Sequence, residues 1–101
     1  GVVEKGETPD QCAQRELREE VGYRARELRR LGGFWTSPGF CDEYLHAFVA
    51  RGLERAELPG DPDEAISTVL VSPADLRAMV LDGAIQDAKT LALLALSGLV
   101  P

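Results

Sequence analysis

Apolar positions recur with a helical period near the start of the chain. Ala13, Leu17 and Val21 are spaced four residues apart, so in a helix they share one face. The segment Thr8-Pro9-Asp10-Gln11 precedes them and offers an N-cap hydroxyl, a proline at the first helical position and a capping-box glutamine. Gly22 follows them as a stop signal. We therefore predict a helix from Pro9 to near Val21, with those three apolar residues buried.

The period then changes to that of extended chain. Residues 25–35 and 43–53 read as strands, and Ser37-Pro38-Gly39 between them reads as a turn. The second strand is apolar on both sides, as expected for a sheet that is covered on both faces. Its two sides carry Tyr44, His46, Phe48 and Ala50, and Leu45, Ala47 and Val49.

The second half of the chain alternates in the same way. An acidic loop over residues 58–64 (LPGDPDE) precedes a predicted strand at residues 66–71. Ser72-Pro73 then starts a second helix that Gly83 ends, and Asp87 caps a third. No repeat or linker interrupts residues 1–101, so we expect one domain of the α/β (α+β) class, with a mixed β-sheet sandwiched between helices.

Composition and charge narrow the class of protein. The 101 residues are 45% hydrophobic, enough for one small core, and the net charge of −6 argues against nucleic acid as a partner. No apolar run approaches the ~20 residues of a membrane span, and no signal peptide is recognisable. Two cysteines, Cys12 and Cys41, lack metal-site spacing and are too few for a disulfide framework. We expect a soluble, cytoplasmic protein.

Carboxylates crowd one edge of the predicted helix. Glu16, Glu19 and Glu20 are neighbours by i,i+3 and i,i+4 spacing, and Arg15 can reach Glu19 and fold back toward Glu7. No lysine lies between positions 6 and 88, so the cluster is under-neutralised. Mg²⁺ would remove this repulsion while keeping positions for water and phosphate oxygens. The substrate expected from this chemistry is a phosphate ester or anhydride.

These residues also match a known motif. Gly1, Glu7 and the segment RELREEVGY at residues 15–23 fill every fixed position of a 23-residue pattern. The chain thus resembles the Nudix hydrolases, which cleave nucleoside diphosphates linked to another moiety. The resemblance implies that Glu16, Glu19 and Glu20 bind Mg²⁺ or Mn²⁺, that Glu19 and Arg15 serve catalysis, and that Arg15 pairs with Glu7 to hold the loop and helix in shape.

Two later segments resemble one subfamily, the ADP-ribose pyrophosphatases. They are TSPGFCDEYLHAFVARGL at residues 36–53 and DGAIQDAKTLALL at residues 82–94, with Pro38 fifteen residues beyond Tyr23. The resemblance implies hydrolysis of ADP-ribose to AMP and ribose 5-phosphate. Two alternatives stay open: hydrolysis of another nucleoside diphosphate sugar, and a non-catalytic module that senses ADP-ribose.

The resemblance also suggests further site residues. It places Pro38, Gly39 and Glu43 at the substrate, although Glu43 could also be a solvated residue at a strand entry. Glu64 occupies the place of the water-activating base, with Asp61 and Asp63 close enough in sequence to compete for that role. Simpler structural roles, such as packing, account for Phe34, Trp35, His46, Cys12 and Cys41.

Gly1 is already the first position of the motif. By resemblance, strands that precede the motif are absent, and a further N-terminal segment helps relatives to form a homodimer. We therefore expect residues 1–101 to be an incomplete catalytic domain that is weakly active and self-associates, and the complete protein to be a homodimer.

Overall fold

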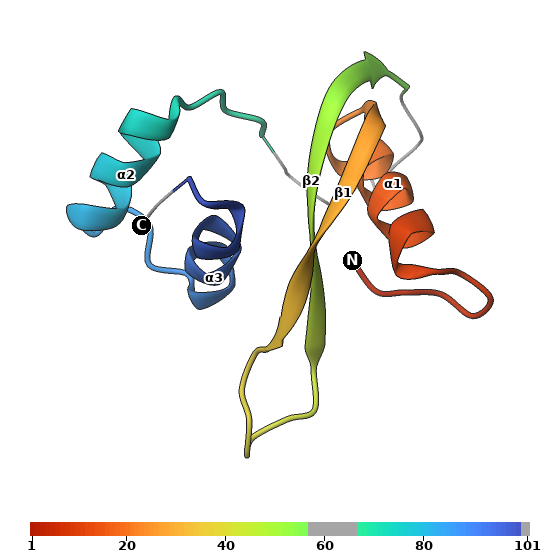
Figure 1. Ribbon diagram of the computed structural model, residues 1–101, viewed down its shortest axis with the longest axis horizontal. Helices are drawn as coiled ribbons and strands as arrows, with labels where there is room; N and C mark the ends of the chain where they lie inside the picture. The colour runs from red at the N-terminus through yellow and green to blue at the C-terminus, as the bar shows by residue number, and fades with distance from the viewer. Residues whose placement is uncertain (57–66, 100–101) are drawn as a thin grey trace. The chain divides into compact units, whose positions relative to one another are not determined.

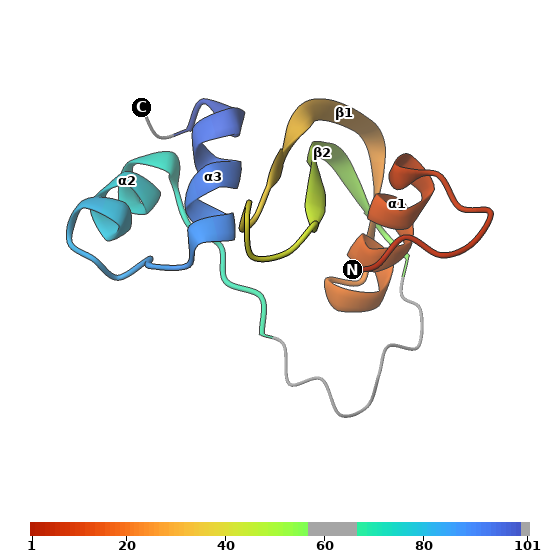
Figure 2. The same cartoon turned by 90° about the horizontal axis from the view of Figure 1, so that it is seen from below.

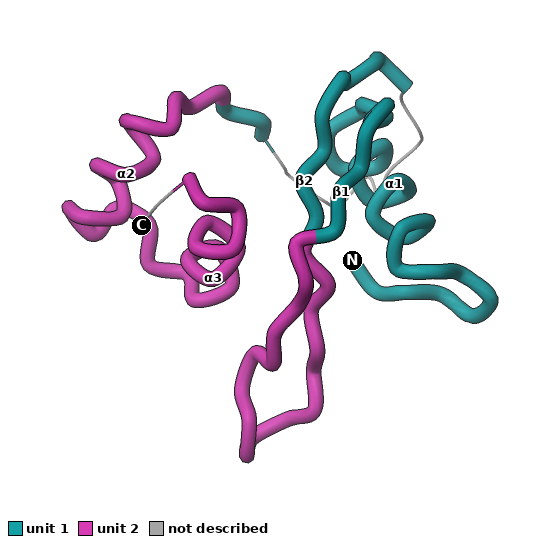
Figure 3. The backbone as a smooth tube through the Cα atoms, viewed as in Figure 1, with its two compact units in different colours: residues 1–30, 48–69 teal, residues 31–47, 70–101 magenta. Residues whose placement is uncertain are grey.

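The computed structural model describes residues 1–56 and 67–99. Their elements are, in order, α1 (Pro9–Glu20), β1 (Tyr23–Trp35), β2 (Tyr44–Arg55), α2 (Pro73–Leu81) and α3 (Ala88–Ser97) (Figure 1). The chain divides into two compact units (Figure 3), one of residues 1–30 and 48–69 and the other of residues 31–47 and 70–101. Both strands pass through both units.

In the first unit, α1 begins and ends where the sequence predicts. The Thr8 hydroxyl accepts a hydrogen bond from the Gln11 backbone N–H (3.2 Å), and the Gln11 side chain accepts one from the Thr8 backbone N–H (2.9 Å). This capping box satisfies two backbone donors that the first turn leaves unpaired. Val21 is the C-cap, and Gly22 follows with φ at +80°. The left-handed conformation turns the chain directly into β1.

The two strands form an antiparallel hairpin. Figures 1 and 2 show them side by side, and among the described residues the two strands pair only with each other. The Ala56 N–H donates to the Gly22 carbonyl (2.9 Å) at one end, and the Thr36 N–H donates to the Glu43 carbonyl (3.1 Å) at the other. Because the partner's number falls as the strand number rises, the strands run in opposite directions.

The loop between the strands contains the predicted turn. The N–H groups of Phe40 and Cys41 both donate to the Ser37 carbonyl at 3.0 Å, and Gly39 has φ at +84°. These contacts close the turn within residues 37–41 and belong to the second unit.

The second unit also contains α2 and α3. The Ser72 hydroxyl caps α2 by accepting from the Asp75 N–H (3.1 Å), and the Asp87 carboxylate caps α3 by accepting from the Thr90 N–H (2.9 Å). The backbone bond from Thr90 lowers the pKa of Asp87, because it stabilises the ionised carboxylate. Both predicted helix starts are thus confirmed.

The class of fold is confirmed, since the described residues combine helices with a β-sheet, which in this part of the chain is the antiparallel pair of β1 and β2. The strand predicted at residues 66–71 is wrong over residues 67–71, which have no strand assignment; residue 66 lies outside the described residues. A strand requires hydrogen bonds to a neighbouring strand, and in the described part of the chain only β1 and β2 pair. Apolar composition alone therefore did not produce a strand there.

Few residues are buried. Cys12, Ala25 and Ala47 are the buried apolar residues of the described chain, and Ala47 has no exposed surface. The predicted face of Ala13, Leu17 and Val21 is half-buried rather than buried. Apolar packing of these three residues therefore contributes less to holding α1 in place than full burial, as predicted from the sequence, would. None of the helices described is long and apolar enough to cross a membrane.

Candidate active site

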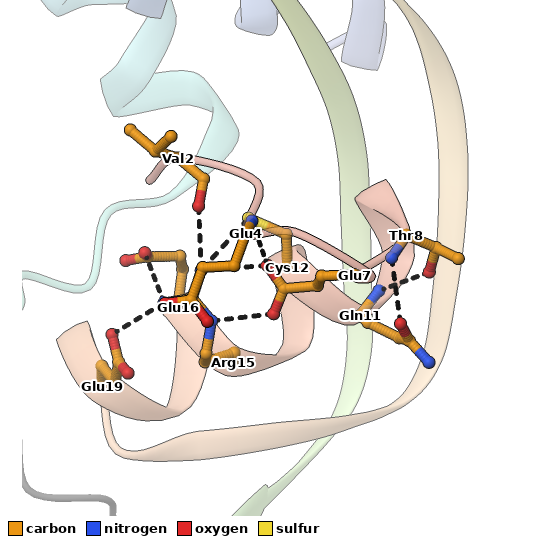
Figure 4. Close-up of polar contacts among 9 residues, drawn as sticks. All are labelled: Val2, Glu4, Glu7, Thr8, Gln11, Cys12, Arg15, Glu16 and Glu19. Atoms are coloured by element: carbon orange, nitrogen blue, oxygen red, sulfur yellow. Dashed lines mark hydrogen bonds and ion pairs between the residues drawn. The ribbon is translucent and has the colours of Figure 1, made fainter.

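The candidate site is built from the loop before α1 and from one edge of that helix (Figure 4). Arg15, on α1, forms a two-pronged ion pair with Glu7 of the loop. Its Nε donates to Glu7 Oε2 (2.9 Å) and its Nη2 donates to Glu7 Oε1 (3.1 Å). The predicted pairing of Arg15 with Glu7 is therefore present, in the geometry that suits a planar guanidinium.

The ion pair shifts the pKa values of both partners. The hydrogen bonds from Arg15 lower the pKa of Glu7 from its ordinary value of 4.5 to about 2, and the Glu4 N–H adds to this effect by donating to Glu7 Oε1 (3.0 Å). The same pair raises the pKa of Arg15 above its ordinary value. Glu7 is thus ionised, and Arg15 charged, throughout the neutral pH range.

Arg15 also fastens the start of the chain. Its Nη2 donates to the Val2 carbonyl (3.0 Å), and the Glu7 N–H donates to the Glu4 carbonyl (3.0 Å). One side chain of the helix therefore holds two points of the preceding loop, which fixes where residues 1–7 lie relative to α1 within this unit.

Two further carboxylates of α1 contact the same guanidinium (Figure 4). Arg15 Nη1 lies 2.9 Å from Glu16 Oε1 and 3.3 Å from Glu19 Oε2, and Glu4 Oε1 is 3.7 Å away. Four carboxylates therefore face one guanidinium, and negative charge is in excess. The Arg15 side chain is 21% exposed, so the contacts with Glu16 and Glu19 are only partly screened by water.

Gly1 lies directly against Glu16. A Cβ atom added at Gly1 would collide with the Glu16 carboxyl group. The Glu16 carboxyl group is the far end of a flexible side chain, so a larger residue at position 1 would require that side chain to move aside.

The donors of this cluster fit a divalent cation in their chemistry. Mg²⁺ prefers oxygen ligands, and Glu16 and Glu19 already place carboxylate oxygens on one cationic nitrogen atom, Arg15 Nη1. In the described part of the chain, no three acidic, histidine or cysteine side chains converge as a metal-binding group. The structure thus places Glu16 and Glu19, two of the three predicted metal ligands, on one guanidinium nitrogen atom.

The predicted substrate residues belong to the other unit. Pro38 and Gly39 lie in the turn between the strands, and the Glu43 Oε1 accepts from the Thr36 hydroxyl (2.8 Å). This bond gives Glu43 a partner across the base of the hairpin loop. Glu64, the predicted base, and its competitors Asp61 and Asp63 lie outside the described residues.

Other residues have roles that the sequence did not reveal. Gln14 binds the backbone of Ala25 through both atoms of its amide, and Arg18 Nε donates to the Ala56 carbonyl (3.1 Å). Their i,i+4 spacing puts both on one side of α1. An open hollow of about 570 Å³ lies there, lined in part by Arg24 and Arg26, and it contains none of the glutamates that contact Arg15. We place the candidate site at the carboxylates and not in this hollow.

Cys12 is the buried residue of α1. Burial raises the pKa of its thiol, and its sulfur lies 3.6 Å from Arg15 Nη2. It packs under the ion pair as expected for a small core residue, whereas Cys41 is exposed.

Comparison with known proteins adds three findings. A family model described as the NUDIX domain matches residues 1–94. The ADP-ribose pyrophosphatase of Bacillus subtilis is 44% identical over 94 residues, covering 89% of this chain and 50% of that protein. The GDP-mannose pyrophosphatase of Yersinia enterocolitica is 34% identical over 91 residues, covering 87% of this chain and 48% of that protein.

A solved structure is also similar. The crystal structure of an ADP compounds hydrolase superposes with a TM-score of 0.88 at 29% identity, covering 96% of this chain and 52% of that one. The chain spans about half the length of the relatives it matches.

Proposed function

The chain belongs to the NUDIX family, and from that membership we propose that it hydrolyses the pyrophosphate bond of ADP-ribose, yielding AMP and ribose 5-phosphate. The observation that supports this most directly is the cluster at Arg15. Glu16 and Glu19 share one guanidinium nitrogen, and four carboxylates there face one positive charge. Such a cluster suits a substrate that brings phosphate groups together with divalent cations.

We propose Glu16, Glu19 and Glu20 as the ligands of Mg²⁺ or Mn²⁺. When bound, the metal supplies positive charge next to the phosphates and lowers the pKa of coordinated water. The chain's own contribution is orientation. Arg15 and Glu7 keep the loop of residues 1–7 against α1, and Gly1 lets the backbone lie beside the Glu16 carboxylate.

Three further residues and a base complete the proposal. Glu64 accepts the proton of the attacking water, and Pro38, Gly39 and Glu43 bind the substrate. These roles rest on the resemblance of residues 36–53 and of the acidic loop to ADP-ribose pyrophosphatases. Attack occurs at phosphorus, so the bond to the sugar carbon stays intact.

The direct experiment is incubation of the purified protein with ADP-ribose and Mg²⁺, with chromatographic detection of AMP. Release of AMP that stops with EDTA supports the proposal. Absence of AMP under saturating Mg²⁺, from protein shown by circular dichroism to be folded, contradicts it.

A second candidate substrate comes from the similarity to GDP-mannose pyrophosphatase. A panel of ADP-ribose, GDP-mannose and other nucleoside diphosphate sugars, compared by kcat/KM, decides between them. Calorimetry on the same panel detects the remaining alternative, a sensing module, as binding of ADP-ribose without release of AMP.

Two properties of the complete protein are part of the proposal. We infer a homodimer, as the resemblance implies, and a reducing compartment such as the cytoplasm, because Cys12 and Cys41 are both free thiols. Light scattering on the complete protein tests the first property.

A further inference from the structure

The hollow beside α1 is rich in arginine. Its walls are one side of α1, which includes Arg18, and one face of β1, which contributes Arg24, Arg26 and Leu28. Of the 11 basic residues in the chain four line this hollow, and Asp10 is the one acidic residue among the lining residues that the structure describes. Since the whole chain has a net charge of −6, the hollow departs from the overall balance of charge.

Hydrogen bonds within the first unit join the two walls. The Gln14 amide binds both backbone groups of Ala25, at 2.8 and 3.1 Å, and Arg18 Nε donates to the Ala56 carbonyl (3.1 Å) at the end of β2. Both contacts connect α1 to the hairpin and are made by the chain itself. The hollow is therefore preformed, and a ligand binds there without having to order its walls.

Glu54 of β2 holds two of the arginines side by side. Its Oε2 accepts from Arg24 Nη2 (2.9 Å), and its Oε1 lies 3.0 Å from Arg26 Nε. These contacts use one of the five N–H donors of each guanidinium, and one carboxylate faces two positive charges. The side chains of Arg24 and Arg26 are 59% and 71% exposed, so a dissolved ligand can reach them.

The charges around the hollow do not cancel. Arg18 bonds to a neutral carbonyl, which leaves its charge uncompensated by that partner. Arg15 is left out of the balance, because four carboxylates already face its guanidinium. The three remaining arginines stand against the carboxylates of Glu54 and Asp10, which leaves one positive charge in excess.

The size and chemistry of the hollow indicate the class of ligand. A volume of about 570 Å³ exceeds what a bare inorganic anion needs and lies in the range of small-molecule sites, roughly 300–1,000 Å³. Guanidinium groups match phosphate oxygens in geometry, and three of them suit the three terminal oxygens of a phosphate monoester better than the two of a carboxylate. Leu28 is half-buried and offers apolar contact to an organic group.

We propose that this hollow binds a phosphate monoester, with Arg18, Arg24 and Arg26 at the phosphate group and Leu28 beside the organic part. Nucleoside monophosphates and sugar phosphates form this class. The proposal does not depend on hydrolysis of ADP-ribose, although both products proposed for that reaction belong to the same class.

The test is titration of the purified chain with AMP, ribose 5-phosphate and adenosine, followed by calorimetry and by the backbone amide spectrum. EDTA is present throughout, so that no metal at the carboxylates of α1 attracts the phosphate. The variants are Arg24→Gln and Arg26→Gln. Arg29→Gln is the matched control, since Arg29 is exposed on the same strand, does not line the hollow, and its loss changes the net charge equally.

We expect the wild type to bind AMP and ribose 5-phosphate but not adenosine, with shifts of the amide signals of residues 24–28. Arg24→Gln and Arg26→Gln should each weaken binding about tenfold, as typical for loss of a hydrogen bond to a charged group. Arg29→Gln should bind as the wild type does. Because the substituted side chains are exposed, the variants should keep the circular dichroism of the wild type.

Three results would overturn the proposal. They are absence of AMP binding by the folded wild type, adenosine binding as tight as AMP binding, and an equal loss of affinity in Arg29→Gln, which would indicate general attraction by charge. Release of AMP from ADP-ribose with Mg²⁺ is measured separately. Binding that depends on Arg24 and Arg26 without such release supports the hollow and contradicts the hydrolase proposal, and release without binding in EDTA does the reverse.

Discussion

At the scale of single residues, Arg15 determines the electrostatics of the candidate site. Its guanidinium makes contacts with Glu7, Glu16 and Glu19 at 2.9–3.3 Å, and one of these contacts holds the loop while the others restrain the helix carboxylates. Binding a divalent cation would require Glu16 and Glu19 to share their oxygens between Arg15 and the metal. The site therefore combines the ion pair of Arg15 and Glu7 with the carboxylates of Glu16 and Glu19, whose negative charge Arg15 does not fully neutralise.

The charge of the helix carboxylates, and not their shape, should decide activity. Changing Glu16 or Glu20 to Gln keeps side-chain volume and helix propensity but removes an anion that we propose as a metal ligand. We expect AMP release to fall by orders of magnitude, with a melting temperature close to that of the wild type. Near-normal turnover of Glu20→Gln at saturating Mg²⁺ would remove Glu20 from the metal ligands.

The identity of the general base is open to a direct comparison. Loss of a general base typically costs ~10²–10⁴-fold in rate while substrate affinity changes little. We expect Glu64→Gln to lower kcat by this amount and Glu43→Gln to act mainly on KM. If Glu64→Gln loses less than about tenfold and Glu43→Gln loses far more, the two roles are exchanged.

Glu7 should contribute stability that depends on pH. Arg15 lowers the pKa of Glu7 from 4.5 to about 2 in the folded chain, so the contribution is complete above pH 4.5 and is lost as the pH falls toward 2. We expect Glu7→Gln to unfold more easily than wild type at neutral pH, and the difference to shrink through that window. Asp87 titrates in the same direction, but it is present in both proteins and cancels.

Urea unfolding at several pH values between 7 and 2 measures this difference. A gap between wild type and Glu7→Gln that stays constant over the whole range would show that the Arg15 pair stabilises the chain through its shape and not through charge.

At the scale of elements, sequence reasoning worked wherever the signal was local. Helix α1 could be predicted from Thr8, Pro9 and Gln11, because caps depend on residues within one turn. The two strands followed from strand-like segments on either side of a Ser-Pro-Gly turn. The prediction of a strand at residues 67–71 was wrong, because a strand needs a partner strand and an apolar sequence pattern does not show whether one is present.

The same distinction applies to the candidate site. Arg15 and Glu7 are eight residues apart on one loop and helix, so the motif predicts their contact. The contact of Gln14 with Ala25 depends on how the helix packs against the hairpin, and no local pattern shows it. The one sequence feature that points to such a contact is the i,i+4 spacing of Gln14 and Arg18, which places both polar side chains on the same side of α1 beside its apolar face.

Gly33 should be essential for the loop end of the hairpin. A Cβ atom at this residue would lie 2.6 Å from the Leu45 carbonyl oxygen and 2.5 Å from the Tyr44 ring. Backbone cannot yield as a flexible side chain can, so we expect Gly33→Ala to cost about 1–3 kcal/mol of unfolding free energy. The Tyr44 ring packs edge-on against Trp35 with centroids 4.9 Å apart, and Trp35 is the single tryptophan, so its fluorescence reports the disturbance.

Gly98→Ala is the control for this prediction. Gly98 has φ at +77° and no atom within 4 Å of an added Cβ, so its cost is backbone strain of about 1 kcal/mol. Its tryptophan fluorescence should match the wild type. Equal losses of stability with unchanged fluorescence in both variants would show that Gly33 has room for a side chain.

At the scale of the whole molecule, the described residues bury little apolar surface. Cys12, Ala25 and Ala47 are buried and no large side chain is fully buried, although 45% of the chain is hydrophobic. Phe40 is 94% exposed and Leu70 is 97% exposed. Burial of apolar surface is the main favourable term in folding, so these 101 residues have a small reserve of stability and apolar surface left to bury.

We therefore expect the isolated 101-residue chain to self-associate, because contact between copies removes this surface from water and an exposed strand edge offers hydrogen bonds. Size-exclusion chromatography with static light scattering should give a mass that rises with protein concentration, and the melting temperature should rise with it, since association stabilises the folded form by mass action. Exchange of Phe40 and Leu70 for Ser should lower the associated fraction while leaving the helical circular dichroism unchanged. A monomer at every concentration, with a sharp unfolding transition that does not depend on concentration, would contradict the prediction and show that the three small buried residues suffice for an independent core.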